Sequence, residues 1–395
     1  MMNSQKKFNC DIFCTVVDNY GDIGVCWRLA KQLANEHGLV VRLWVDDLSS
    51  FRKLCPQIDI ALPIQQQHGV EIRHWGVIFA DVLPAQLVIE AFACELPERY
   101  VLAMAEQVHQ PLWLNLEYLS AEDWVVGCHG LPSPHLSLPL LKYFFFPGFV
   151  KGTGGLLLER DLFARRDAFL ADSSAQEKYW LSLGVPDLLP NEVRISLFCY
   201  ENTALSGLLA VWSAGTRPVT CLIPEGRVLS QVAAFFGLQQ LVAGDVMQKD
   251  NLRVHVLPFV EQEEYDKLLW ACDINFVRGE DSCVRAQWAG KPFVWHIYPQ
   301  HDGVHMKKLH ALLDLYCHGL EPDIEQAVRE MWDVWNAGAG SAWTGSGQAW
   351  NQFVLHQSML LQHTNIWAMQ LSANKLALNL LDFSLKVGRI APFEI

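Results

Sequence analysis

The chain alternates between apolar runs and amphipathic stretches along most of its length. Residues 8–17 are almost wholly apolar, and a short polar loop then leads into residues 23–37, where apolar residues recur at helical spacing. Residues 40–45 predict a second strand, and residues 48–54 predict a short helix. Further strands are expected from the apolar runs at residues 77–80, 87–90 and 112–116. Strands that alternate with helices are typical of a parallel sheet covered by helices.

This pattern breaks between residues 120 and 190, where prolines, a glycine cluster and charged residues predict loops and a connection between domains. The alternation resumes at residue 193, so the second half predicts another doubly wound α/β sheet. A chain of 395 residues is also longer than a domain with a single hydrophobic core usually is. We therefore expect two Rossmann-like domains, at residues 1–175 and 185–365, with a helix at about residues 370–395 that packs back on the first.

Composition narrows the class of protein. The hydrophobic share of 51% and the charged share of 18% fit a globular protein. A net charge of -13 without a lysine and arginine stripe argues against a nucleic-acid partner. No signal-peptide pattern or membrane-length apolar stretch is present, and the eleven scattered cysteines form no C-x-x-C pair. We therefore expect a cytoplasmic protein with reduced thiols and no membrane partner.

The most informative segment joins two predicted strands at residues 273–277 and 293–297. Its loop carries Arg278 and two adjacent carboxylates, and Ser282 opens a predicted helix. Loops at the carboxyl ends of parallel strands bind ligands in open α/β sheets, and the amide N–H groups of a helix start favour an anion. Arginine suits a phosphate and carboxylates suit sugar hydroxyls. The expected ligand is a nucleotide diphosphate.

A purely structural interpretation of the same loop stays open. Ser282 is a suitable N-cap residue, and the charged residues before it could form an ion pair on a solvated turn. The chemistry at both ends favours a ligand, since the next strand ends in Tyr298 and Gln300 on the same sheet edge.

Two aspartates follow the first predicted strand. Asp18 and Asp22 lie four positions apart across a strand-to-helix turn, and Gly21 between them lets the backbone approach a ligand. Helix capping is the alternative for either residue, because aspartate is a common N-cap. The dinucleotide fingerprint G-x-G-x-x-G is absent, because Asn19 and Tyr20 fill the loop. Paired carboxylates suit a cationic or hydroxylic nucleophile, with one positioning it and the other removing its proton.

Other segments are weaker candidates. Residues 146–155 lack the order of a phosphate loop. His301 and His305 are four apart without a neighbouring glutamate of the metallopeptidase pattern, so we expect no metal. Aromatic residues at strand ends of the second half, Phe198, Tyr200 and Phe259, are core residues or a stacking surface for a nucleoside base.

Several of these motifs together resemble one family. The loop at residues 18–24, the segment 147–156, the strand end at 257–259 and the stretch from Arg278 to Gln300 closely resemble the bacterial protein-arginine rhamnosyltransferases that modify elongation factor P, over nearly the whole chain. The resemblance implies a GT-B glycosyltransferase, with two Rossmann-like domains facing a cleft. The implied reaction moves L-rhamnose from dTDP-β-L-rhamnose to a guanidinium nitrogen of one arginine of elongation factor P, with inversion and without a metal or other cofactor. The modified factor would then relieve ribosome stalling at polyproline.

The resemblance also implies roles for single residues. Asp22 is the expected general base, Asp18 its partner in holding the acceptor guanidinium, and Glu280 a carboxylate essential to transfer. The expected donor-binding residues lie in both loops and at the strand ends of the second half: Asn19, Tyr20, Gly21, Phe198, Tyr200, Phe259, Gln262, Arg278, Gly279, Asp281, Ser282 and Tyr298. Among these, Arg278 and Tyr298 would contact the diphosphate.

Other functions compatible with this fold remain alternatives. A GT-B enzyme could act on a small-molecule or lipid acceptor, and a non-catalytic protein could bind a nucleotide sugar for regulation. The aspartate pair disfavours the second, because a binder needs no base. A nicotinamide-dependent enzyme is disfavoured by the missing glycine fingerprint.

Overall fold

The computed structural model describes residues 8–18, 20–77, 79–185, 189–300, 303–337 and 346–387. The chain divides into two compact units. Unit 1 comprises Met1–Arg160 and Leu371–Ile395, and unit 2 comprises Asp161–Gln370. Each unit is built around its own sheet.

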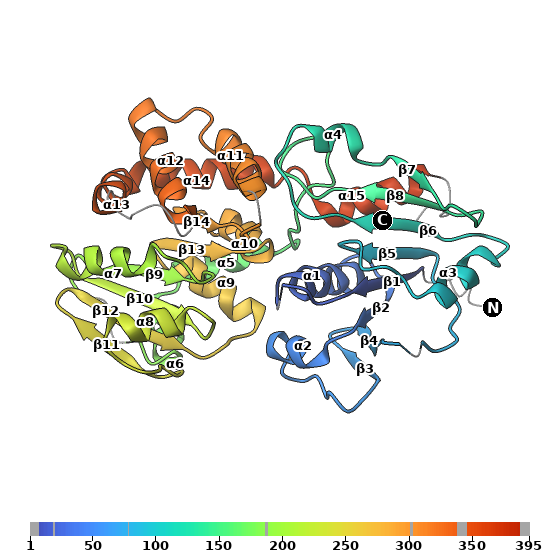
Figure 1. Cartoon of the computed structure of the whole chain (residues 1–395), viewed down its shortest axis with the longest axis horizontal. Helices are drawn as coiled ribbons and strands as arrows, with labels where there is room; N and C mark the ends of the chain where they lie inside the picture. Colours follow the sequence, from blue (N-terminus) through green and yellow to red (C-terminus); the bar gives the residue numbers. More distant parts are fainter. Residues whose placement is uncertain are drawn as a thin grey trace. The chain divides into compact units, whose positions relative to one another are not determined.

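Unit 1 contains an eight-stranded sheet in the order β3-β4-β2-β1-β5-β6-β8-β7 (Figure 1). The six inner strands run parallel, and the edge strands β3 and β7 run antiparallel to their neighbours. Successive strands proceed outward from β1 on one side and from β5 on the other, so the strand order reverses between these two. The strands are β1 (Asn9–Cys14), β2 (Val40–Val45), β3 (Ile64–Gln67), β4 (Val70–His74), β5 (Leu87–Ala91), β6 (Leu112–Leu116), β7 (Pro132–Pro134) and β8 (Leu141–Phe145).

Both faces of this sheet are apolar, and helices therefore cover it. Helix α1 packs on β1 and β2, and α15 contacts α1, with the Phe383 ring 5.9 Å from that of Phe145 in β8. A second core contains Phe13, Trp44 and Val88 from the strands, together with Met104 from α3. The helices of unit 1 are α1 (Gly21–Asn35), α2 (Leu48–Leu54), α3 (Glu98–Ala105), α4 (Trp124–Cys128) and α15 (Leu376–Lys386).

Unit 2 contains a six-stranded sheet in the order β11-β12-β10-β9-β13-β14, parallel except for the edge strand β11. Here the strand order reverses between β9 and β13. The strands are β9 (Val193–Leu197), β10 (Val219–Pro224), β11 (Val246–Lys249), β12 (Leu252–Leu257), β13 (Ile274–Arg278) and β14 (Phe293–His296).

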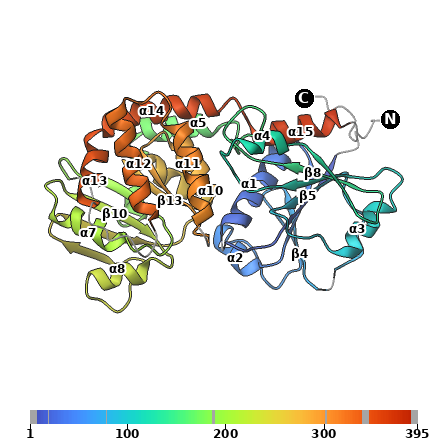
Figure 2. The same cartoon turned by 45° about the horizontal axis from the view of Figure 1, so that its top comes forward.

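The helices of unit 2 surround its sheet, and Figure 2 shows α11 and α12 side by side. An ion pair of 2.8 Å between Arg329 and Asp314 joins these two helices. The helices are α5 (Leu162–Ala171), α6 (Ser173–Ser182), α7 (Leu205–Ala214), α8 (Leu229–Phe235), α9 (Gln262–Ala271), α10 (Asp281–Ala289), α11 (Val304–Tyr316), α12 (Pro322–Asn336), α13 (Ser346–Leu355) and α14 (Gln357–Leu371).

The boundary between the units differs from the expected one at residue 175. Helix α5 belongs to unit 2, because Arg166 Nη1 donates to the Trp288 carbonyl at 2.8 Å and Phe169 packs against Trp270 of α9. The chain returns to unit 1 after residue 370, where Leu156 and Lys375 form a parallel bridge.

Two predictions about elements were wrong. No strand forms from the described residues of the run 77–80, of which Ile78 lies outside the described residues; Val77 is exposed and Phe79 joins the core. The edge hairpin of β3 and β4 lies just before it, and the polar sequence of β3 carries little strand signal. The expected loops and connection at residues 120–190 also contain β7, β8 and the helices α4, α5 and α6. Pro132 and Pro134 are tolerated in β7 because it is an edge strand.

Gly155 provides a test of how the end of the chain is tied to unit 1. Its φ is +78°, and a Cβ there would lie 2.4 Å from the Asn374 carbonyl oxygen, whereas Gly184, with φ +69°, has nothing within 4 Å. We expect Gly155→Ala to lower the free energy of unfolding by about 3 kcal/mol and the matched Gly184→Ala by only about 1 kcal/mol. Chemical denaturation measures both values. Equal losses would show that the contact with Asn374 is not tight.

Candidate functional site

The aspartate loop lies at the reversal point of the unit 1 sheet. Strand β1 ends at Cys14, and the loop that follows leads into α1 next to the carboxyl end of β5. In open α/β sheets this is where ligands bind, because the loops diverge there and leave a crevice. The prediction of a ligand site at the first strand-to-helix turn therefore has a structural basis.

Asp22 is a buried carboxylate with only one of its two oxygens hydrogen-bonded to described residues. Its Oδ2 accepts hydrogen bonds from the backbone N–H of Val17 at 2.9 Å and of Asp18 at 2.8 Å. Its side chain is 4% exposed, and Oδ1 has no hydrogen-bond partner among the described residues. One oxygen thus fixes the loop, while the other can receive a donor from a bound molecule.

Burial raises the pKa of the Asp22 carboxyl above its usual value. The two amide hydrogen bonds act in the opposite direction, and the negative charges of Asp18 and Asp46 add to the rise. A carboxylate with a raised pKa is a stronger base, and an entering cation would be held by its charge.

Neither aspartate is the N-cap of α1. That position is Tyr20, which makes no side-chain capping bond, and the helix begins at Gly21. A Cβ at position 21 would lie 3.0 Å from Asp18 Oδ2, so glycine leaves room for that carboxylate. Asn19 lies outside the described residues.

The expected donor-binding residues of unit 2 gather at one sheet edge. Phe198 and Tyr200 follow β9, Phe259 follows β12, Arg278 ends β13 and Tyr298 follows β14. All four strands are parallel, so these residues share the carboxyl edge, and β9 and β13 flank the reversal point. The structure thereby brings together residues separated by up to a hundred positions.

Arg278 lies between two of these aromatic rings. Its guanidinium carbon is 4.4 Å from the centroid of Phe198 and 4.7 Å from that of Tyr200, and Nη1 donates to the Cys199 carbonyl at 3.4 Å. The side chain is 6% exposed. Tyr298 is half exposed and packs edge-on against Tyr200 at 5.4 Å. Cation–π contacts thus fix the aromatic surface and keep a positive charge beneath it.

The turn between β13 and α10 differs in detail from the expected one. The N-cap of α10 is Glu280 and the helix begins at Asp281, one residue before Ser282. The Ser282 hydroxyl accepts from the Arg278 N–H at 3.0 Å and donates to the Arg278 carbonyl. Ser282 therefore closes the turn, and the Gly279 carbonyl accepts from Trp295 Nε1 at 2.8 Å.

A charged and a polar side chain from neighbouring helices hold this turn. Lys308 of α11 contacts Glu280 Oε1 through Nζ at 3.1 Å, and Gln262 of α9 contacts Asp281 at 3.3 Å. Beneath them, Arg285 and Asp266 form a buried pair at 2.7 Å that ties α10 to α9. Lys308 thus positions Glu280 at an edge that carries Arg278 and Lys308 as well as a second carboxylate, Asp281.

Sequence reasoning missed Lys308, His296 and Asp46. His296, in β14, is 5% exposed, and its Nδ1 has no partner within the described part of the chain. Burial, with the charge of Arg278, lowers its pKa to about 3, so the ring is neutral beside Tyr200. His296 stands at the end of an apolar strand, next to Ile297, and nothing in the sequence distinguishes it from a core residue.

Metal binding and membrane insertion also bear on the class of protein. Within the described ranges, no group of three or more His, Cys, Asp or Glu side chains could hold a metal ion; His301 lies outside them, and His305 Nδ1 accepts from the Gln300 amide at 3.1 Å. Of the helices in those ranges, none is both long and apolar enough to cross a bilayer.

Two parallel-sheet units with ligand edges at their reversal points define the GT-B class of glycosyltransferases. A solved glycosyltransferase from Rickettsia africae shares this fold with a TM-score of 0.52 at 11% identity, covering 97% of this chain and 98% of that one. A family model described as elongation-factor P (EF-P) rhamnosyltransferase EarP matches residues 10–385, and the chain belongs to that family.

Individual relatives agree with this assignment. The protein-arginine rhamnosyltransferase of Pseudomonas putida is 51% identical, over 95% of this chain and 98% of the relative. A solved structure that concerns EarP-mediated arginine glycosylation of translation elongation factor EF-P is 37% identical, with a TM-score of 0.69 over 96% of this chain and 99% of that one. The expected family and fold class are confirmed.

The pKa of Asp22 provides the first test of this site. Asp46 Oδ1 accepts from the Val16 amide at 2.9 Å, and an asparagine can keep that bond while losing the charge. Asp46→Asn should therefore lower the pKa of Asp22, so that ionisation occurs at lower pH. A carboxyl-carbon NMR titration of labelled aspartate, with Asp22→Asn to assign the signal, measures this. An unchanged or raised pKa would contradict the electrostatic account.

Lys308 provides the second test, in unit 2. Lys308→Met removes a positive charge that lies against Glu280 near the expected diphosphate, so it should weaken the binding of dTDP by about 5- to 10-fold. Lys307→Met is the matched control, because Lys307 is exposed and has no ion pair to any described residue. Isothermal calorimetry compares the two, and equal affinities would exclude the role assigned to Lys308.

Proposed function

We propose that this protein transfers L-rhamnose from dTDP-β-L-rhamnose to a guanidinium nitrogen of an arginine in translation elongation factor P. The observation that carries this proposal is Asp22, a buried carboxylate with one oxygen fixed and the other available at the reversal point of unit 1. Membership of the EF-P rhamnosyltransferase family supports rhamnose as the transferred sugar and elongation factor P as the acceptor. Transfer proceeds with inversion and needs no metal or other cofactor.

The acceptor chemistry requires a carboxylate pair. Arginine is protonated in water, with a pKa above about 12, so its guanidinium is a poor nucleophile. Asp22 and Asp18 bind it through charge-assisted hydrogen bonds and hold one nitrogen in place. Asp22 takes the proton only as the nitrogen–carbon bond forms, and its raised pKa favours that transfer.

The donor chemistry requires positive charge at the leaving diphosphate. The carboxyl edge of unit 2 offers Arg278, Lys308 and the amide N–H groups at the start of α10. The aromatic rings of Phe198 and Tyr200 provide a surface for the thymine base, and Glu280 accepts hydrogen bonds from rhamnose hydroxyls. Phe259, Gln262, Asp281 and Tyr298 complete the donor site in this proposal.

The biological consequence is part of the same proposal. The reaction takes place in the cytoplasm, and the modified elongation factor relieves ribosome stalling at polyproline. A small-molecule or lipid acceptor is the competing outcome, and a wild-type protein that leaves elongation factor P unmodified while it consumes dTDP-rhamnose would favour it.

Asp22→Asn tests the role of the base. Asparagine can still accept the Val17 and Asp18 amide bonds through Oδ1, so the loop keeps its shape, but it cannot take a proton. Rhamnosylation of elongation factor P, followed by its intact mass, should fall by about 100-fold or more. Binding of dTDP-rhamnose should persist.

Asp81→Asn is the control, because this carboxylate of the same unit is 75% exposed and, among the residues that the structure describes, forms an ion pair with the exposed Arg99 alone. It should modify the factor at the wild-type rate. An Asp22→Asn protein that is as active as this control would exclude Asp22 as the general base.

A further inference from the structure

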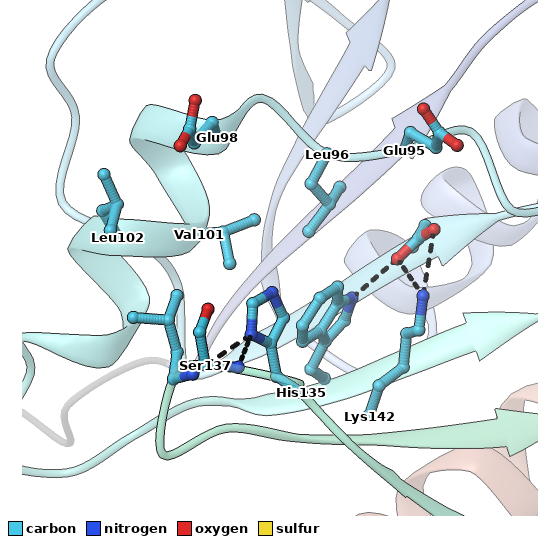
Figure 3. A pocket seen from close by; sticks show the side chains of 11 residues that line it. Glu95, Leu96, Glu98, Val101, Leu102, His135, Ser137 and Lys142 are labelled. Atoms are coloured by element: carbon cyan, nitrogen blue, oxygen red, sulfur yellow. Dashed lines mark hydrogen bonds and ion pairs between the residues drawn. The ribbon is translucent and has the colours of Figure 1, made fainter.

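Unit 1 contains a cavity of about 380 Å³ that no role described so far uses (Figure 3). It lies beside α3, between that helix and the strands β5, β6 and β8. We call it the α3 cavity. Its lining combines three carboxylates with apolar walls: Glu90, Glu95, Leu96, Glu98, Val101, Leu102, Trp113, His135, Ser137, Leu138 and Lys142. Its volume lies in the lower part of the range for ligand-binding pockets.

The floor of the α3 cavity is formed by polar side chains that are hydrogen-bonded to one another. Glu90 is 2% exposed and accepts from Trp113 Nε1 at 3.0 Å and from Lys142 Nζ at 3.2 Å. The Lys142 ammonium also lies 4.8 Å from the centroid of the Trp113 ring. The single lysine is therefore neutralised within the floor, which leaves no positive charge for an anionic ligand.

The rim carries the uncompensated charge. Glu95 and Glu98 are both exposed, and neither forms an ion pair or hydrogen bond to any residue that the structure describes. Figure 3 shows Glu98 on α3 and Glu95 on the loop before it, with the apolar Leu96 and Val101 between them. The cavity thus offers aliphatic walls below and negative charge above, which suits a long side chain that ends in a cation.

The rim is held by a strained loop that begins at the reversal point of the sheet. Phe92, Ala93 and Glu95 all adopt positive φ, between 52° and 57°, although none is glycine. Such residues persist only where the surroundings impose them, and they gather at binding sites. The Phe92 amide donates to Leu116 O at 2.7 Å and the Ala93 amide donates to Asn115 Oδ1 at 3.1 Å.

This loop connects the α3 cavity to the acceptor edge. It starts at the carboxyl end of β5, the neighbour of β1, after which the Asp18 and Asp22 loop begins. The Phe92 ring stacks on Tyr118, which follows β6, at 4.6 Å, so an aromatic surface continues along the same edge. A protein that presents an arginine to Asp22 would extend over this edge.

We propose that the α3 cavity receives a second lysine or arginine side chain of the acceptor protein, distinct from the modified arginine. This inference rests on the proposed function and adds an anchor to it. The aliphatic stem lies against Leu96, Val101 and Leu138, and the cation is attracted by the combined negative charge of Glu95 and Glu98. The anchor increases affinity for a folded acceptor without taking part in bond formation.

The test compares two double variants with a matched control. Glu95→Gln with Glu98→Gln keeps the shape of the rim and removes its charge, and should weaken the binding of elongation factor P by about 5- to 20-fold, with a smaller salt dependence. Glu95→Lys with Glu98→Lys should weaken it further. Glu106→Gln, at the other end of α3 and outside the cavity, should bind like the wild type. Unchanged affinity for dTDP-rhamnose reports an intact fold.

A double-mutant cycle identifies the partner group. Each lysine and arginine of elongation factor P is replaced by alanine, and its effect on affinity is measured with wild type and with the Gln double variant. One residue other than the modified arginine should lose its effect in the double variant. Two results would overturn the proposal. One is a Gln double variant that binds elongation factor P as tightly as Glu106→Gln does, and the other is that every lysine and arginine of the factor keeps its full effect in the double variant. A wild-type protein that neither binds nor modifies the factor would instead remove the proposed function together with this anchor.

Discussion

Both ligand edges depend on one constraint of parallel sheets, which is that the loops at the carboxyl ends diverge where the strand order reverses. In unit 1 this point lies between β1 and β5, and in unit 2 between β9 and β13. Backbone groups at strand ends are not used by the ladder, so side chains such as Asp22 and Ser282 bind them and fix the loops. The same topology therefore positions opposite chemistries, with carboxylates in unit 1 and a guanidinium under aromatic rings in unit 2.

Three buried carboxylates of unit 1 differ in how completely they are hydrogen-bonded. Asp11, with no exposed surface, binds Arg42, Trp44, Tyr100 and the Ala85 amide, so it has no capacity left for a ligand. Glu90 has two partners and forms the floor of a cavity, and Asp22 leaves one oxygen available. Burial of an incompletely bonded carboxylate is unfavourable, and such a group is expected where a ligand completes its bonding.

Sequence patterns predicted the two sheets well, because buried parallel strands are continuous apolar runs. They failed where an edge strand departs from that rule, as in the polar β3 and the proline-containing β7. Site residues next to a strand end, such as Asp18 and Arg278, could be predicted from local sequence. Lys308 could not, because it reaches Glu280 from a helix 28 positions away. The positive φ of Phe92 was equally invisible, since its surroundings impose it and its residue type does not.

The ion pair of Lys308 and Glu280 explains how a carboxylate can occupy an edge built for an anion. A lone glutamate beside a diphosphate would repel it, and more strongly in a partly buried site than in water. Lys308, at 3.1 Å, offsets that charge and still leaves Glu280 oxygen lone pairs for hydroxyl donors. In the proposed function, Arg278 and the helix amides would bind phosphate, and the carboxylate of Glu280 would bind the sugar. This arrangement would then favour a sugar nucleotide over a plain nucleotide, because the transferred sugar's hydroxyls would bind Glu280.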